Sequence, residues 1–77
     1  MNAPMREVTF TQTHRRTHRR RNIVVSQFGH TAGLAWRYIM QTADGPWTKF
    51  RRVDIALDAS DDEVMLAVAR HLAGPVA

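Results

Sequence analysis

LAWRYIMQ, residues 34–41, alternates more regularly than any other part of this 77-residue chain. Its even-numbered positions are all apolar, whereas the odd-numbered positions include Arg37. A period of two is typical of a strand with one buried face. Because Trp36, Ile39 and Met40 also have the spacing of a helix face, a helix is the alternative. We favour the strand, since turn residues flank the segment on both sides.

Those turn residues set the limits of the strand. Gly33 precedes it, and ADGP, residues 43–46, follows it. Asp-Gly is a strong hairpin signal, so the chain is expected to return antiparallel. We predict that residues 47–57 form the returning strand. Its inward face would carry Val53, Ile55 and Leu57.

Two further strands are predicted before this hairpin. Residues 22–28 are dense in β-branched side chains, which favour strands. Residues 7–13 alternate, with Val8 and Phe10 on one face and threonines on the other. Residues 1–6 fit a loose tail.

The last element is predicted to be a helix that starts after Ser60. Ser60 suits the N-cap position, and Glu63, three residues later, completes a capping box. Asp61 and Asp62 fall in the first turn, where the helix dipole favours negative charge, so the acidic cluster does not require a metal. A Gly-Pro pair ends the helix. Its apolar stripe consists of Val64, Ala67, Val68, His71 and Leu72.

These elements predict an α+β fold, with a small antiparallel four-stranded sheet followed by one C-terminal helix in the order β-β-β-β-α. Residues 1–21 form a basic N-terminal tail or first-strand region, and residues 22–77 form one domain of sheet and helix. Two points stay open. Residues 7–13 either form a strand or belong to the tail, and the basic tract after them either links two strands or forms the tip of their hairpin.

Composition limits the class of protein. The chain is 44% hydrophobic and 23% charged, which is ordinary for a globular domain and too apolar for disorder throughout. No apolar run approaches the roughly 20 residues of a membrane span, and residues 1–7 lack the apolar segment of a secretory signal. We therefore expect a cytoplasmic protein without membrane contact. With no cysteine and a thin core, a homodimer is the expected source of further stability.

Positive charge is concentrated in HRRTHRRR, residues 14–21, which holds five arginines and two histidines. The net charge is +5 over residues 1–22, +3 over residues 23–53 and −4 over residues 54–77. Ten arginines against one lysine favour a surface that binds phosphates, because the planar guanidinium offers them two parallel donors. The pattern predicts nucleic acid as the partner.

Catalytic and metal sites have little support in the sequence. His14 and His18 have the spacing of metal ligands on a helix, but the arginines around them repel a cation and no carboxylate completes the set. Neither of the two serines lies in a nucleophile elbow, and no phosphate-binding glycine loop occurs. We expect no metal, no cofactor and no enzymatic activity. His71 is expected to pack within the helix stripe.

Aromatic residues are interleaved with arginines in the later strand segments. Unpaired bases stack on aromatic rings while basic side chains hold the phosphates. We expect Trp36 in the core, whereas Trp47 and Phe50 fit a core position and a base-stacking position about equally. The predicted nucleic-acid-binding residues are Arg15, Arg16, Arg19, Arg20, Arg21, Phe28, Arg37, Trp47, Lys49, Arg51 and Arg52.

Residues 21–72 resemble the positive-cofactor-four family of transcriptional coactivators, which bind single-stranded DNA and are related in fold to Whirly proteins. The similar segments are RNIVVSQF (21–28), LAWRYIMQTADGPW (34–47) and RRVDIAL (51–57), followed by the helix. The step from a strand-ending Phe to an Arg nine residues later corresponds here to Phe28 and Arg37.

The resemblance implies a strongly curved four-stranded sheet that dimerises through its helices and presents a basic, aromatic groove to unpaired DNA. By position, Phe28 would stack a base, and the phosphate contacts would come from Arg37, Arg51 and Arg52. The chain departs from the family at Met40, where an aromatic is usual, and at the helix start, which reads DASDDEV.

Three functions therefore remain for comparison. The first is a dimeric protein that binds single-stranded or melted DNA in transcription or replication control. The second is a sheet that lies in the major groove of duplex DNA, as the arm-binding domains of phage integrases do. The third is a phage-type regulatory protein whose basic face binds an acidic surface of a protein target.

Overall fold

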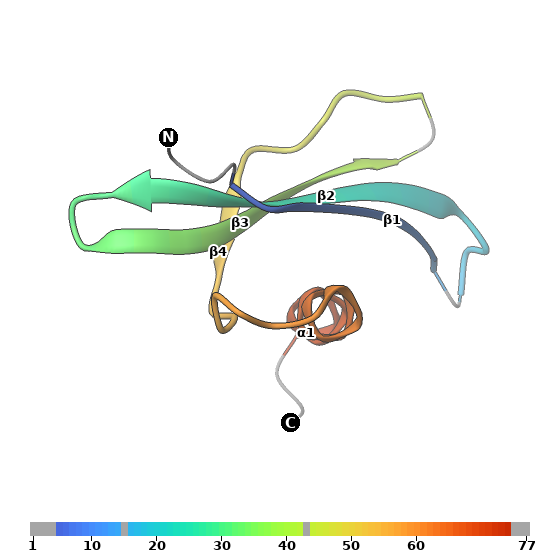
Figure 1. The fold of residues 1–77 in the computed structure, drawn as a ribbon. Coiled ribbons are helices and arrows are strands. Elements are labelled where there is room, and N and C mark those ends of the chain that lie inside the picture. Colours follow the sequence, from blue (N-terminus) through green and yellow to red (C-terminus); the bar gives the residue numbers. More distant parts are fainter. Residues whose placement is uncertain (1–4, 15, 43, 75–77) are drawn as a thin grey trace.

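The computed structural model describes residues 5–14, 16–42 and 44–74. Its elements are β1 (Glu7–Thr13), β2 (Arg20–His30), β3 (Gly33–Thr42), β4 (Arg51–Val53) and α1 (Asp61–Ala73). The strands form one antiparallel sheet in the order β1-β2-β3-β4, and α1 covers one face of it (Figure 1). The predicted α+β fold of four strands and a final helix is confirmed. The described residues contain no helix that is long and apolar enough to span a membrane.

Strand register separates the sheet into two faces. Val25 lies opposite Tyr38, and Ile23 lies opposite Met40, so their side chains point to the same side. We call this side, which α1 covers, the inner face, and the other side the outer face. Trp36 is 0% exposed on the inner face, as predicted. The buried core consists of Val8, Ile23, Val25, Trp36, Tyr38, Val53, Ala59, Val64 and Val68.

The helix begins where the sequence predicts. Ser60 Oγ accepts a hydrogen bond from Glu63 N at 3.2 Å, and Glu63 Oε1 accepts one from Ser60 N at 3.3 Å, which together form the predicted capping box. His71 is exposed, but its Nδ1 lies 2.7 Å from the Tyr38 hydroxyl and the two rings meet edge to face. It thus borders the core rather than lying inside the apolar stripe.

Replacing Ser60 by alanine is expected to lower the free energy of unfolding by about 1 kcal/mol, because the backbone N–H of Glu63 loses its acceptor. Urea denaturation followed by circular dichroism would measure the change. The matched control is Thr31→Ala in the exposed β2–β3 turn, which is expected to change little. An equal effect of the two substitutions would show that the cap does not hold the helix.

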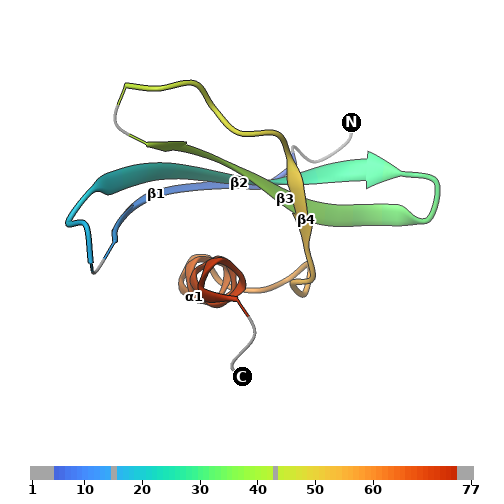
Figure 2. The same cartoon turned by 180° about the vertical axis from the view of Figure 1, so that it is seen from behind.

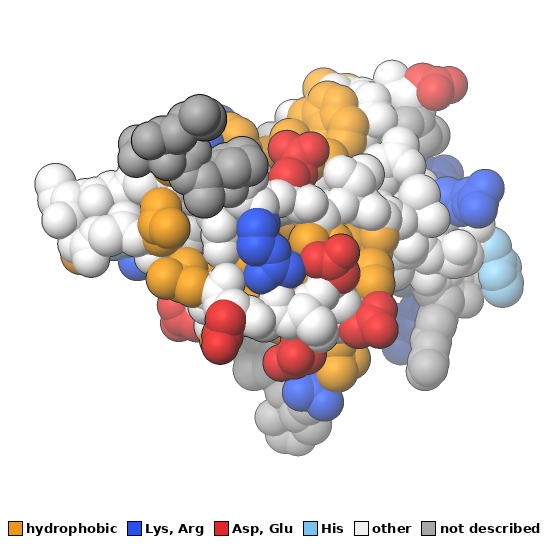
Figure 3. Space-filling view, viewed as in Figure 1, with side chains coloured by type: hydrophobic (Ala, Val, Ile, Leu, Met, Phe, Trp, Pro, Cys, Tyr) orange, Lys and Arg blue, Asp and Glu red, His pale blue; other side chains and the backbone are white. Residues whose placement is uncertain are grey.

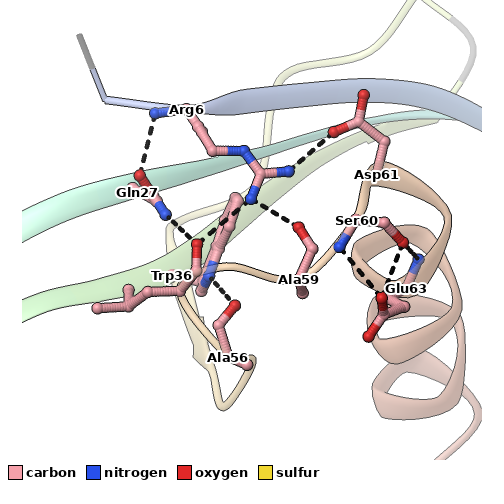
Figure 4. A network of polar contacts seen from close by, with 9 residues as sticks. Arg6, Gln27, Trp36, Ala56, Ala59, Ser60, Asp61 and Glu63 are labelled. Carbon is pink, nitrogen blue, oxygen red and sulfur yellow. Dashed lines mark hydrogen bonds and ion pairs between the residues drawn. The ribbon is translucent and has the colours of Figure 1, made fainter. Parts of the chain in front are cut away.

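Arg6 fastens the start of β1 to the segment before α1 (Figure 4). Its Nη1 donates to Ala59 O at 2.6 Å, and its Nη2 pairs with Asp61 Oδ1 at 2.9 Å. The guanidinium carbon lies 5.3 Å from the centre of the Trp36 ring, and Trp36 Nε1 donates to Ala56 O at 3.2 Å. These contacts hold α1 in place beneath the sheet.

The structure shows that the N-terminal strand exists. β1 pairs with β2 along its whole length, from Glu7 opposite Ser26 to Thr13 opposite Arg20. The basic tract therefore forms the tip of the β1–β2 hairpin, and its last two arginines begin β2. β2 and β3 extend beyond the predicted 22–28 and 34–41, because the ladder continues up to the turn, where His30 pairs with Gly33.

The prediction of a continuous strand over residues 47–57 is wrong. Trp47 forms an isolated bridge with Gln41, and regular pairing is limited to β4, which is three residues long. The segment crosses from the outer side of the sheet to the side of α1 (Figure 2), so it pairs with β3 only where it passes the edge. Ile55 still packs against the core, whereas Leu57, predicted to point inward, is 46% exposed.

Candidate nucleic-acid interface

An arginine is stacked between two phenylalanines on the outer face. Arg37 follows the buried Trp36 on β3, so strand alternation turns it away from α1. Its guanidinium carbon lies 4.8 Å from the centre of the Phe28 ring and 3.8 Å from the centre of the Phe50 ring. The cation is thus held between two aromatic faces, a favourable arrangement for a positive charge.

The loop between β3 and β4 brings Phe50 to this place. In Figures 1 and 2 the loop lies on the side of the sheet opposite α1. Thr48 anchors it, because its N–H donates to Met40 O at 2.8 Å and its Oγ1 accepts from Met40 N at 3.0 Å. Phe50 remains 54% exposed, so one side of the stack is accessible to a ligand.

The charge on this face is not neutralised within the described residues. Arg52 on β4 lies directly opposite Arg37 on β3, and cross-strand like charges repel. The neighbour of Arg52 is His30, whose Nε2 lies 3.4 Å from the guanidinium. Arg37 Nε is buried without a hydrogen-bond partner, and the ion pair of the described chain is Arg6–Asp61, elsewhere. We call Phe28, His30, Arg37, Phe50 and Arg52 the outer-face cluster.

A second basic region is the hairpin tip, which in the described chain consists of residues 14 and 16–20. His14 orders this turn, because its N–H donates to Arg19 O at 2.9 Å and its Nδ1 accepts from Arg16 N and from Thr17 N, each at 3.3 Å. His18 adopts the left-handed conformation with φ of 54°. The exposed arginines described here are Arg16, Arg19 and Arg20.

Charge is therefore polarised across the molecule. Acidic side chains gather around α1 and the segment before it, whereas basic side chains stand at the hairpin end (Figure 3). Arg20 and Phe28 share the outer face of β2, about 26 Å apart at roughly 3.3 Å per residue. The outer-face positions between them on β2 carry Asn22, Val24 and Ser26, and Glu7 of β1 is the acid that stands beside Ser26.

Two of the predicted site residues point away from the outer face. Arg21 is half-buried on the inner side, where its Nε donates to Gln12 Oε1 at 3.1 Å. Arg51 lies opposite the buried Tyr38, so the register puts it on the inner side as well. The arrangement therefore separates Arg51 from Arg52, which the family resemblance placed together on phosphates.

The other predicted residues lie on the loop or outside the described chain. Trp47 is 43% exposed and Lys49 is exposed, both on the outer-side loop. Arg15 lies outside the described residues. Phe50, which fits a core and a base-stacking position equally by sequence, and His30, which is not among the predicted residues, both belong to the outer-face cluster. The local signal for Phe50 was its place directly before Arg51 and Arg52.

Comparison with known proteins adds no further identification: no family model, no curated protein and no solved structure matches this chain. The resemblance to the positive-cofactor-four family thus stays a prediction from short motifs. In the described part of the chain, no group of three or more histidines and carboxylates is placed to hold a metal. The outer-face cluster and the hairpin tip are the two basic surfaces of the described chain.

Proposed function

We propose that this protein binds single-stranded nucleic acid, with a preference for DNA, along the outer face of its sheet. The observation that carries the proposal is the Phe28–Arg37–Phe50 stack beside Arg52, which puts exposed aromatic surface next to unneutralised positive charge. Single strands are bound by this combination, because bases stack on rings while cations follow the phosphates.

Exposed rings favour unpaired bases over a duplex. In a double helix the faces of the bases are covered by their neighbours, so Phe50 and Trp47 would have only the backbone and the groove edges to contact. The bound strand would follow β2 from the outer-face cluster to the hairpin tip, where Arg20 and its neighbours hold further phosphates. A protein that captures melted DNA in this way suits transcription or replication control.

The direct test is fluorescence anisotropy with a labelled oligonucleotide, single-stranded and as a duplex, over a series of salt concentrations. Tight single-strand binding that weakens steeply with salt is expected, because each phosphate contact releases counterions. A preference for the duplex would instead support a sheet that enters a groove. No binding to either form at low salt would mean that the arginines face an acidic protein.

Replacing Phe50 by alanine is expected to weaken single-strand binding by about 1–3 kcal/mol, or about 5- to 150-fold, because one stacking surface is lost. The measurement is the same anisotropy titration at fixed salt. Leu66→Ala is the matched control, since Leu66 is 53% exposed on α1, away from the sheet. Equal affinities of the two variants would contradict a role for the stack in binding.

A further inference from the structure

The two free edges of the sheet are built differently. β4 is three residues long and carries Arg51 and Arg52, so it offers little to another strand. β1 is seven residues long, EVTFTQT, with neither proline nor lysine and one charge at its start. In the described chain β1 pairs with β2 alone, and their register runs without a bulge. Sheets block pairing at their edges by a short edge strand, charged residues, proline or a bulge. Of these features β1 has a single charge, at Glu7.

The hydrogen-bond pattern shows which main-chain groups β1 leaves free. Gln27 N donates to Arg6 O at 2.9 Å, so the carbonyl of Arg6 points toward β2. In an antiparallel ladder the direction alternates from residue to residue, so even-numbered residues of β1 bond to β2. The odd-numbered residues therefore direct N–H and C=O outward. They are Glu7, Thr9, Thr11 and Thr13.

We propose that β1 pairs antiparallel with β1 of a second copy of this chain, across a two-fold axis beside Phe10. The free N–H and C=O groups of the two β1 strands can bond to each other only when odd-numbered residues face odd-numbered residues. Of the registers that meet this condition, the one centred on Phe10 uses all of β1. It places Thr9 opposite Thr11 of the second copy, and Glu7 opposite Thr13 of the second copy.

Side chains on both faces complement this register. On the inner side Phe10 meets its own copy, and an aromatic pair across strands is favourable. Phe10 is half-buried, as are Met65 and Leu72 of α1, so an apolar strip lies at this edge and a second copy would cover it.

On the outer side the charges match as well. Thr13 lies beside Arg20 within one copy, so Glu7 of the other copy comes two strands from that arginine, about 10 Å away at roughly 4.8 Å per strand. The two-fold axis repeats the contact, which brings the acidic start of each β1 to the basic hairpin tip of its partner. The pairing does not depend on the proposed function, and it is distinct from the helix-mediated dimer that the family resemblance implies.

Sedimentation equilibrium tests the proposal with charge variants. The unchanged chain is expected at twice its 8.8 kDa mass. We expect two double variants to be monomeric, Thr9→Lys with Thr11→Lys and Thr9→Glu with Thr11→Glu. In each of them residue 9 of one copy faces a like charge at residue 11 of the other. An equimolar mixture of the two variants should dimerise again, because opposite charges then face each other. Leu66→Lys on the exposed side of α1 is the matched control and should remain dimeric. A monomer at the highest soluble concentration, or a dimer that only Leu66→Lys disrupts, would overturn the proposal.

Cross-linking tests the register itself, since the chain has no cysteine of its own. At a non-hydrogen-bonded antiparallel pair the Cα atoms are about 4.5 Å apart, within disulfide range. Phe10→Cys is therefore expected to form a covalent dimer on mild oxidation. Thr13→Cys is the control, because its two copies would lie about 20 Å apart at roughly 3.3 Å per residue. Cross-linking of Thr13→Cys without cross-linking of Phe10→Cys would exclude this register.

Discussion

Replacing Trp36 by alanine is expected to lower the free energy of unfolding by about 3–5 kcal/mol, the range for deleting a large buried aromatic. Its ring is fully buried between β3 and the segment before α1, and its Nε1 donates to Ala56 O at 3.2 Å. The substitution leaves a cavity, removes the donor for that carbonyl and takes away the ring beneath Arg6. Domains of this size are stable by only about 4–12 kcal/mol, so the variant should be largely unfolded at moderate urea concentration.

Trp47→Ala is the matched control for this substitution, because it removes the same side chain from a position that is 43% exposed. It is expected to change stability by less than about 1 kcal/mol. Urea denaturation followed by far-ultraviolet circular dichroism measures both variants without relying on tryptophan emission. If Trp47→Ala destabilised the protein as much as Trp36→Ala does, the outer-side loop would be part of the core.

Substituting glutamine at Arg16, Arg19 and Arg20 together is expected to weaken single-strand binding by roughly a few hundredfold at 50 mM salt. Each phosphate contact contributes about 0.7 to the slope of log K against log salt, so three contacts account for about 2 in that slope. Substitution is a better test than deletion of residues 14–21, because Arg20 and Arg21 belong to β2 and His14 orders the turn.

The salt series measures both quantities in one experiment. Arg70→Gln removes an exposed arginine from the last turn of α1 and is expected to leave the slope nearly unchanged. A smaller slope of log K against log salt in the triple glutamine variant (the hairpin variant), with unchanged binding by Arg70→Gln, would locate the phosphate contacts at the tip. If the hairpin variant kept the full slope, the bound strand would not reach that end of β2.

Much of the fold follows from local signals. The alternation over residues 34–41 and the capping box at Ser60 each depend on nearby residues, and both are confirmed. The prediction of a strand over residues 47–57 is wrong because the path of this segment depends on the position of α1. A segment that must cross from one side of the sheet to the other cannot keep pairing, whatever its alternation.

The candidate site was less accessible to sequence reasoning. Neighbouring residues of a strand point to opposite faces, so Arg20 and Arg21 cannot both lie on the outer face, nor can Arg51 and Arg52. Which member of each pair faces outward depends on the register with β1 and β3. The contact of Phe50 with Arg37 depends on a loop that folds back over the sheet, and no spacing along the chain indicates it.

The order of the strands also sets a sequence of events during synthesis. Each strand pairs with the one made just before it, so the sheet can assemble from short-range contacts, which generally fold fast. Its inner face, with Trp36 and Tyr38, nevertheless stays uncovered until α1 has left the ribosome. Arg6 is synthesised early, but its hydrogen bonds to Ala59 and Asp61 can form only after those residues have been synthesised. A nascent chain that stalls before Ser60 is therefore expected to present an open apolar sheet, a form that attracts chaperones and aggregates readily.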